Sequence, residues 1–150
     1  MILCVDPGAK TGVAYFNPAT FIDCDTVSMI QLLGDIENRA ATLDAVIYED
    51  SRKIGKLFST ARAGTKAAQI KIARNVGEID GYCRIIEELC LALEVPCYGI
   101  SAKAKGGKLS GDQMRAHIST WPDKSNQHER DAAMLWFARP MHLRGKNVGN

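Results

Sequence analysis

The chain has 150 residues, of which 46% are hydrophobic and 24% charged, and its formal net charge is +2. This length is typical of one domain, and the hydrophobic content is enough for a sizeable core. No apolar stretch reaches membrane-spanning length, and the first apolar run, at 2–5, is too short for a secretion signal, so we expect neither a membrane protein nor a secreted one.

The first half of the chain predicts four strands and one helix. An apolar run at 2–5 ends at an Asp-Pro-Gly sequence, and residues 12–16 have the pattern of its hairpin partner. A third strand is expected between 20 and 27. Residues 28–41 have the apolar spacing of a helix, with a serine as its N-cap. A fourth strand at 43–48 then leads into two acidic residues.

The second half alternates helices with connectors and one more strand. In chain order we expect a basic connector at 51–64, a long amphipathic helix at 65–93, a strand at 95–100, a lysine- and glycine-rich loop at 101–109, a short helix from 110, a helix at 127–137 and a frayed tail at about 141–150. Three antiparallel strands followed by alternating strands and helices predict an α/β fold, with a mixed five-stranded sheet and helices on both faces.

Positive charge is concentrated in two segments. Residues 51–75 hold seven basic side chains and no acidic one, and three more lysines lie at 103–108. Such density suits a nucleic-acid backbone, because each neutralised phosphate releases counterions, although a solvated charged face gives the same pattern. The candidate DNA-binding residues are Arg52, Lys53, Lys56, Phe58, Arg62, Lys103, Lys105 and Lys108. The ring of Phe58, the one aromatic residue in this set, either wedges between bases or packs back on the core.

The five cysteines predict free thiols rather than a disulfide framework. Their number is odd, no Cys-x-x-Cys pair exists, and most lie in apolar surroundings. This usage is typical of a reducing compartment, so the expected location is cytoplasmic or otherwise intracellular.

Three acidic residues stand where expected elements begin or end. Asp6 follows the first strand, Glu49 follows the fourth, and Asp131 lies early in the last helix, one turn after His128. If the first and fourth strands are neighbours, all four side chains converge, because residues three apart share a helix face. Each acid also has a structural interpretation, as a turn former or a helix-dipole partner, and Asp50 is an alternative to Glu49.

Convergent carboxylates repel one another unless a cation lies between them. A few hard oxygen ligands suit Mg²⁺, which keeps waters and takes further oxygens from a substrate phosphate. Two such ions can activate water and stabilise the leaving oxygen of a phosphodiester.

Five segments in order resemble RuvC-type Holliday-junction resolvases of the RNase H-like superfamily, over nearly the whole chain. They are Asp6-Pro7-Gly8 with Gly12, Val46–Glu49, the helix from Gln69 to Glu88 with Gly77, Cys97–Ser101 followed by Lys103 to Lys108, and His128–Ala133 with Asp131-Ala132.

The resemblance implies a single nuclease domain whose catalytic and metal-binding residues are Asp6, Glu49, His128 and Asp131. It implies two Mg²⁺ ions, replaceable by Mn²⁺, and cleavage of four-way DNA junctions in recombination and repair. A homodimer is expected through the helix at 65–93, because a junction has two equivalent strands to cut. His128 stands where the family has either Asp or His, and the connector after Glu49 matches the family poorly.

Three other interpretations remain open from the sequence. A nuclease of the same fold could act on flaps, forks or structured RNA, because the acidic site handles only the phosphate. An actin-like ATP-binding protein also opens its phosphate loop with Asp-x-Gly, but it needs a duplicated domain. A non-catalytic nucleic-acid-binding module is the third, and the intact acidic set argues against it.

Overall fold

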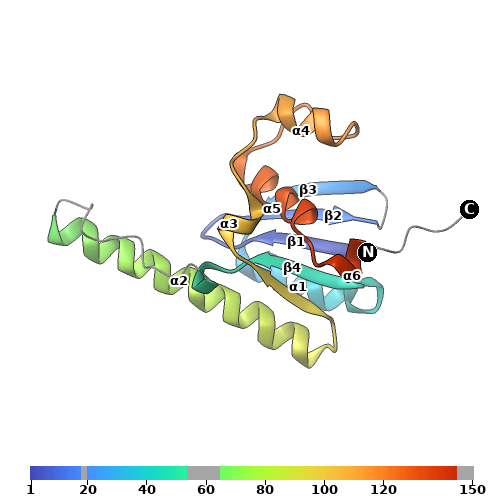
Figure 1. The fold of residues 1–150 in the computed structure, drawn as a ribbon. Coiled ribbons are helices and arrows are strands. Elements are labelled where there is room, and N and C mark those ends of the chain that lie inside the picture. The colour runs from blue at the N-terminus through green and yellow to red at the C-terminus, as the bar shows by residue number, and fades with distance from the viewer. Residues whose placement is uncertain (18–19, 54–64, 145–150) are drawn as a thin grey trace, which may run out of the picture.

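A mixed five-stranded sheet forms the centre of the computed structural model, which describes residues 1–17, 20–53 and 65–144 (Figure 1). The strands are β1 (Ile2–Asp6), β2 (Thr11–Phe16), β3 (Phe21–Val27), β4 (Ala45–Glu49) and β5 (Cys97–Ile100). Their order is β3-β2-β1-β4-β5, in which β1 pairs antiparallel with β2 and parallel with β4, and β4 pairs parallel with β5. The predicted fold class and the predicted sequence positions of the five strands are therefore confirmed.

The two central strands are apolar on both faces because helices cover both. Ile2–Val5 and Ala45–Tyr48 are buried throughout, which is typical of parallel strands inside an α/β sheet. The edge strand β3 is only partly buried and carries polar residues. Burial thus increases from the edge strands β3 and β5 to the strands between them.

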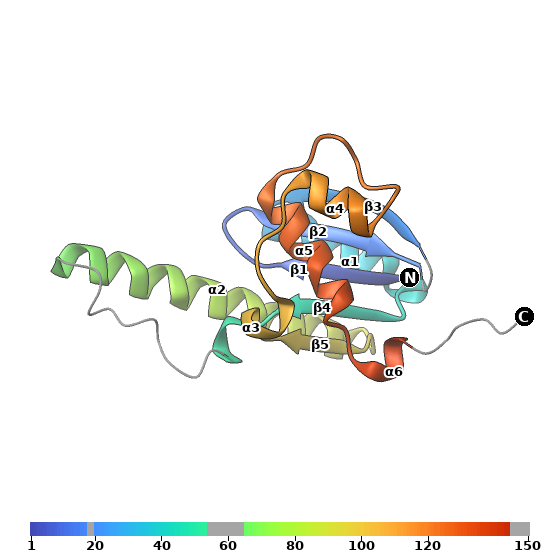
Figure 2. The ribbon, with the colours of Figure 1, turned by 45° about the horizontal axis from the view of Figure 1, so that its top comes forward.

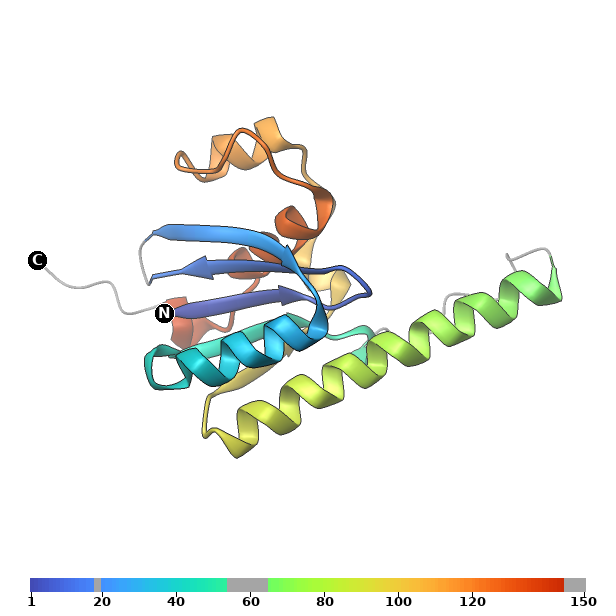
Figure 3. The same cartoon turned by 180° about the vertical axis from the view of Figure 1, so that it is seen from behind.

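One face of the sheet is covered by α1 (Met29–Arg39) and α2 (Lys66–Ala92), as Figure 3 shows from behind. Ser28 caps α1 as predicted, in a reciprocal capping box with Gln31. Leu32 and Ile36 of α1 and Cys83, Ile86 and Cys90 of α2 join the core on this face. The amino-terminal part of α2 extends beyond the sheet (Figures 1 and 3).

The other face is covered by α5 (Gln127–Phe137), which crosses β1, β2 and β4, with α4 (Gly111–His117) beside it (Figure 2). Trp136 stacks on Phe16 with ring centroids 4.5 Å apart. Trp121 and Trp136 are both buried. The apolar side of α5 is therefore held against the central strands of the sheet.

Two short helices occupy segments predicted to be irregular. The lysine-rich loop contains α3 (Ala102–Lys105), because the Ser101 side chain accepts a hydrogen bond from the amide of Ala104 and caps a turn. The first residues of the predicted tail form α6 (Met141–Arg144). The predicted contacts of Lys56, Phe58 and Arg62 fall outside the described residues.

The described helices include none that is both long enough and apolar enough to span a bilayer. The five cysteines are free thiols, as predicted, and Cys4, Cys83 and Cys90 are buried.

Candidate active site

The parallel pairing of β1 with β4 places two carboxylates at one edge of the sheet. Val5 lies opposite Tyr48, so Asp6 and Glu49, the next residues, leave the two strands side by side. Asp131 approaches the same edge from α5 and is 6% exposed. The fold thus brings Asp6, Glu49 and Asp131 together at this edge, the convergence that the sequence predicted.

A lysine lies at the centre of this carboxylate cluster, here defined as Asp6, Glu49 and Asp131. Lys105 Nζ forms an ion pair with Glu49 Oε2 and lies 3.4 Å from Asp131 Oδ1 and 4.0 Å from Asp6 Oδ1. Its side chain is only 9% exposed. Lys105 was predicted to contact DNA from a loop; the structure places it instead at the end of α3, inside the cluster.

His128 lies at the rim of the cluster. Its Nδ1 is 3.5 Å from Asp6 Oδ2, and its side chain is 46% exposed. Asn126 caps α5 and forms a capping box with Glu129, whose carboxylate also accepts a hydrogen bond from Thr26. Glu129 is therefore a structural residue, whereas His128 and Asp131 face the carboxyl ends of the central strands.

A glycine allows α5 to approach this closely. Gly12 lies opposite Asp6 in the β1–β2 hairpin. A Cβ atom at Gly12 would lie less than 3.0 Å from the carbonyl group of His128, a separation that Cβ atoms essentially never show. Because the obstacle is backbone, any larger side chain at Gly12 would push α5 away from the sheet.

The charges of the cluster are coupled. Burial raises the pKa of Asp6 to about 6, with Lys105 opposing the rise and Glu49 and Asp131 adding to it. Burial also disfavours the charged form of Lys105, but contact with Glu49, aided by Asp6 and Asp131, outweighs it and raises the pKa of the ammonium. The cluster therefore favours a bound positive charge, whereas burial and the two neighbouring carboxylates disfavour the ionised form of Asp6.

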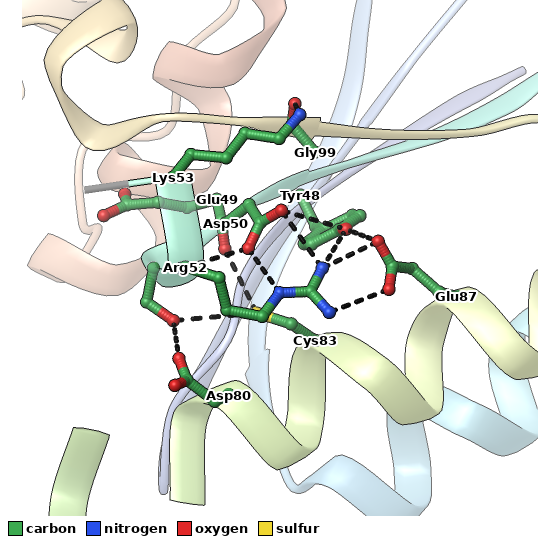
Figure 4. A network of polar contacts seen from close by, with 10 residues as sticks. Tyr48, Glu49, Asp50, Arg52, Lys53, Asp80, Cys83, Glu87 and Gly99 are labelled. Atoms are coloured by element: carbon green, nitrogen blue, oxygen red, sulfur yellow. Dashed lines mark hydrogen bonds and ion pairs between the residues drawn. The ribbon is translucent and has the colours of Figure 1, made fainter. Parts of the chain in front are cut away.

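Asp50 faces the opposite direction from Glu49 and belongs to a separate network (Figure 4). Its Oδ1 accepts a hydrogen bond from Arg52 Nε at 2.7 Å, and its side chain is 4% exposed. Arg52 also reaches both carboxylate oxygens of Glu87 on α2, at 2.7 and 2.9 Å, and the hydroxyl of Tyr48. Of the two acids left open by the sequence, Glu49 alone faces the carboxylate cluster.

This Arg52 network, comprising Tyr48, Asp50, Arg52 and Glu87, joins the end of β4 to α2. Burial tends to raise the pKa of Asp50, but hydrogen bonds from Arg52 outweigh it and lower that pKa below its usual value. Nearby, Ser51 donates to Asp80 at 2.6 Å, and the Cys83 thiol donates to the carbonyl of Glu49 at 3.6 Å. The backbone that carries Glu49 is thereby held by the long helix.

The predicted DNA-binding residues thus have different environments. The Arg52 guanidinium is held by internal carboxylates, and Lys53 Nζ donates to the carbonyl of Gly99 at 2.8 Å. Lys103 and Lys108 are exposed on and after α3. Sequence reasoning missed the Arg52 network and the position of Lys105; the Ser101 cap before Ala104 was the one local signal for α3.

The donor set fits a hard divalent cation. Glu49 Oε2 is buried and, among the described residues, has no hydrogen-bond partner, so the ion pair with Lys105 is what neutralises it. In the described part of the chain, no group of three acidic, histidine or cysteine side chains already has the arrangement of a metal site. The carboxylates are gathered around the ammonium, and their oxygens are the ligands that Mg²⁺ prefers.

Comparison with known proteins bears on the fold. No family model matches the chain, and no curated protein is similar to it in sequence. Among solved structures, T. thermophilus RuvC in complex with a Holliday junction substrate is similar to it, with a TM-score of 0.56 and 15% sequence identity, over 95% of this chain and 94% of that one. At this identity the similarity shows the fold alone: the mixed five-stranded sheet flanked by helices is RuvC-like.

Proposed function

We propose that this chain is a metal-dependent endonuclease that cleaves phosphodiester bonds in branched DNA and resolves four-way junctions. The observation that carries the proposal is the convergence of Asp6, Glu49 and Asp131 from β1, β4 and α5 at one edge of a RuvC-like sheet. Three carboxylates around one buried positive charge have the composition of a divalent-metal site.

In this proposal Asp6, Glu49, Asp131 and His128 hold two Mg²⁺ ions, which Mn²⁺ can replace. Bound there, the ions supply activation of water and stabilisation of the leaving oxygen. The protein supplies rigid positions for the ligands: β1 and β4 fix Asp6 and Glu49, and the Asn126 cap fixes the first turn of α5. His128, at the exposed rim, contributes an imidazole nitrogen, a ligand that suits Mn²⁺ better than Mg²⁺.

Branched DNA is the proposed substrate because the similar solved structure is described as a complex with a Holliday junction. Lys103 and Lys108 are exposed, lie two residues before and three residues after Lys105 in the sequence, and are suited to backbone phosphates. Lys56 and Arg62 of the connector are proposed to contact backbone phosphates, and the ring of Phe58 to stack on a base near the crossover.

A homodimer through α2 is part of the proposal. The helix is 27 residues long, and its apolar Ile70, Ile72 and Ile85 are 45%, 38% and 43% exposed. A two-fold dimer would present two equivalent sites to the two strands of a junction that must be cut. Light scattering of the free protein and of its junction complex tests this, and a monomer in both states would refute it.

A cleavage assay tests the proposed activity. Purified protein is incubated with a synthetic four-way junction, a flap, a fork, structured RNA and a linear duplex, with Mg²⁺, with Mn²⁺ and with chelator. We expect cleavage of the junction only with a divalent ion. Asp6→Asn, Glu49→Gln and Asp131→Asn should abolish cleavage and leave junction binding largely intact, because basic residues rather than carboxylates contact the phosphates.

Asp123→Asn is the matched control, because this carboxylate is 97% exposed and lies outside the carboxylate cluster. It should cut as the unchanged protein does. Cleavage of flaps, forks or RNA in preference to junctions would support the proposed nuclease activity and contradict the proposed substrate. Junction binding without cleavage in either ion would identify a non-catalytic binding module.

A further inference from the structure

We propose that Lys105 is a tethered counter-ion that competes with divalent cations for the carboxylate cluster and thereby sets the metal affinity of the site. This inference rests on the proposed metal-dependent function and deepens it. It assigns to Lys105 a role toward the metal site, where the sequence predicted contact with DNA.

The position of the ammonium carries the argument. Lys105 Nζ lies within 4.0 Å of an oxygen from each of the three carboxylates, which come from three different elements. The side chain is 9% exposed, so water contributes little to the solvation of its charge. A divalent ion that takes these oxygens as ligands must take them from the ammonium.

Charge balance prevents the ammonium and two metal ions from sharing the cluster. The carboxylates carry at most three negative charges, and Lys105 supplies one positive charge. Two divalent ions bring four positive charges, so with Lys105 in place the site would hold five positive against three negative. Like charges at such short range in a buried site repel strongly, and the ammonium must therefore leave as the second ion binds.

The chain around Lys105 allows that movement. α3 has only four residues, and Lys105 is the last of them. Gly106 follows with a φ of 92°, then Gly107, and a Cβ atom added at either position would meet nothing within 4 Å. A short helix before two unhindered glycines can be displaced at little cost, and the lysine side chain has its own flexible stem.

Two consequences follow for the metal-free protein. Lys105 neutralises part of the negative charge of the carboxylates, so the folded chain tolerates them without metal. Lys105 also makes divalent binding weaker than the three carboxylates alone would give, because each binding event includes the displacement of an ion pair.

The test compares Lys105→Met with Lys103→Met, an exposed lysine two residues earlier on α3. Mn²⁺ affinity is measured from the electron paramagnetic resonance signal of free Mn²⁺, and thermal unfolding is recorded with and without the ion. We expect Lys105→Met to bind Mn²⁺ at least about tenfold more tightly, a change of about 1.4 kcal/mol, and Lys103→Met to bind it as the unchanged protein does. The Mn²⁺-free Lys105→Met protein should melt at a lower temperature and gain more from the ion.

A second measurement uses the unchanged protein, in case the metal-free variant does not fold. Lysine acetylation by an N-hydroxysuccinimide ester is followed at each residue by mass spectrometry. Without metal, Lys105 should react far more slowly than Lys103 and Lys108. With saturating Mn²⁺, its rate should rise towards theirs.

The outcomes separate this inference from the function on which it rests. Equal Mn²⁺ affinity in all three proteins, or a Lys105 that stays protected while Mn²⁺ is bound, would overturn the counter-ion role and leave the proposed nuclease intact. Absence of Mn²⁺ binding in all three proteins would overturn both.

Discussion

Replacement of Gly12 by alanine should separate the folding of the sheet from the assembly of the site. The added Cβ atom would lie less than 3.0 Å from the carbonyl group of His128 and 3.0 Å from the amide nitrogen of Glu129. All of these atoms belong to backbone in the first turn of α5, so the helix must move as a unit. The movement would carry His128 and Asp131 away from Asp6.

The expected losses follow from a shift on the order of 1 Å. Overpacking of this kind costs about 1–3 kcal/mol of unfolding free energy, and a misplacement of about 1 Å in a catalytic group costs about 100-fold in rate. Gly12→Ala should therefore remain folded, bind junction DNA and cleave it about 100-fold more slowly. Urea unfolding and single-turnover cleavage in saturating Mn²⁺ measure the two effects.

Gly34→Ala is the matched control, because a Cβ atom there, within α1, would meet nothing within 4 Å. Alanine is favoured over glycine inside a helix by about 1 kcal/mol, so this variant should be more stable and equally active. If Gly12→Ala had the stability and the cleavage rate of the unchanged chain, α5 would accommodate the methyl group without moving the ligands. The close approach of α5 to Gly12 would then have no role in catalysis.

Two further predictions concern charge. Asp6 has a folded-state pKa of about 6 against an ordinary 3.8, so its contribution to stability is fully present below pH 3.8 and is lost as pH rises through 6. By urea unfolding, the metal-free protein should therefore lose roughly 1 kcal/mol of unfolding free energy between pH 5 and pH 7 beyond any loss in Asp6→Asn. The same dependence of unfolding free energy on pH in both proteins would contradict this. Arg52→Met should destabilise by about 3–5 kcal/mol, because it leaves the 4%-exposed Asp50 unpaired. Glu87→Gln, at a side chain 43% exposed, should cost less than about 1 kcal/mol, and similar losses in the two variants would argue against the Arg52 network as the anchor of β4.

The sequence was sufficient for the sheet and for the carboxylates, because both depend on local patterns. Apolar runs that end in an acid define β1 and β4, and the capping pattern of Asn126 with Glu129 defines the start of α5. Once the two strands are neighbours, Asp6 and Glu49 must leave the sheet together. The three-residue spacing of His128 and Asp131 then places both on the same side of their helix.

The partners of these residues could not be predicted in the same way. Lys105 and Lys108 are equivalent in a lysine- and glycine-rich segment, and only the turn begun at Ser101 points one of them into the cluster. Arg52 is one of seven basic residues in its segment, and its partner Glu87 lies 35 positions away on α2. Such pairings depend on tertiary distance, which neither composition nor periodicity contains.

We expect the acid dependence of metal binding to have a source in Asp6 as well as in His128. A histidine ligand alone predicts weaker metal binding below about pH 6.5. In the structure Asp6 has a raised pKa near the same value, and it lies at the centre of the site, whereas His128 is 46% exposed at the rim. Replacement of His128 by aspartate is therefore expected to change metal preference more than the acid limb of the activity profile.

Glu49 and Asp50 are adjacent in sequence, and the fold neutralises them in different ways. Asp50 meets the guanidinium of Arg52, whose planar fork is shared with Glu87 and which stays charged at any pH the protein meets. Glu49 meets the ammonium of Lys105, a single point charge on a flexible stem, at the end of a four-residue helix. The first pairing has several simultaneous hydrogen bonds and suits a permanent joint between β4 and α2. The second has one point charge among three carboxylates, which suits the exchange for a metal ion that we propose.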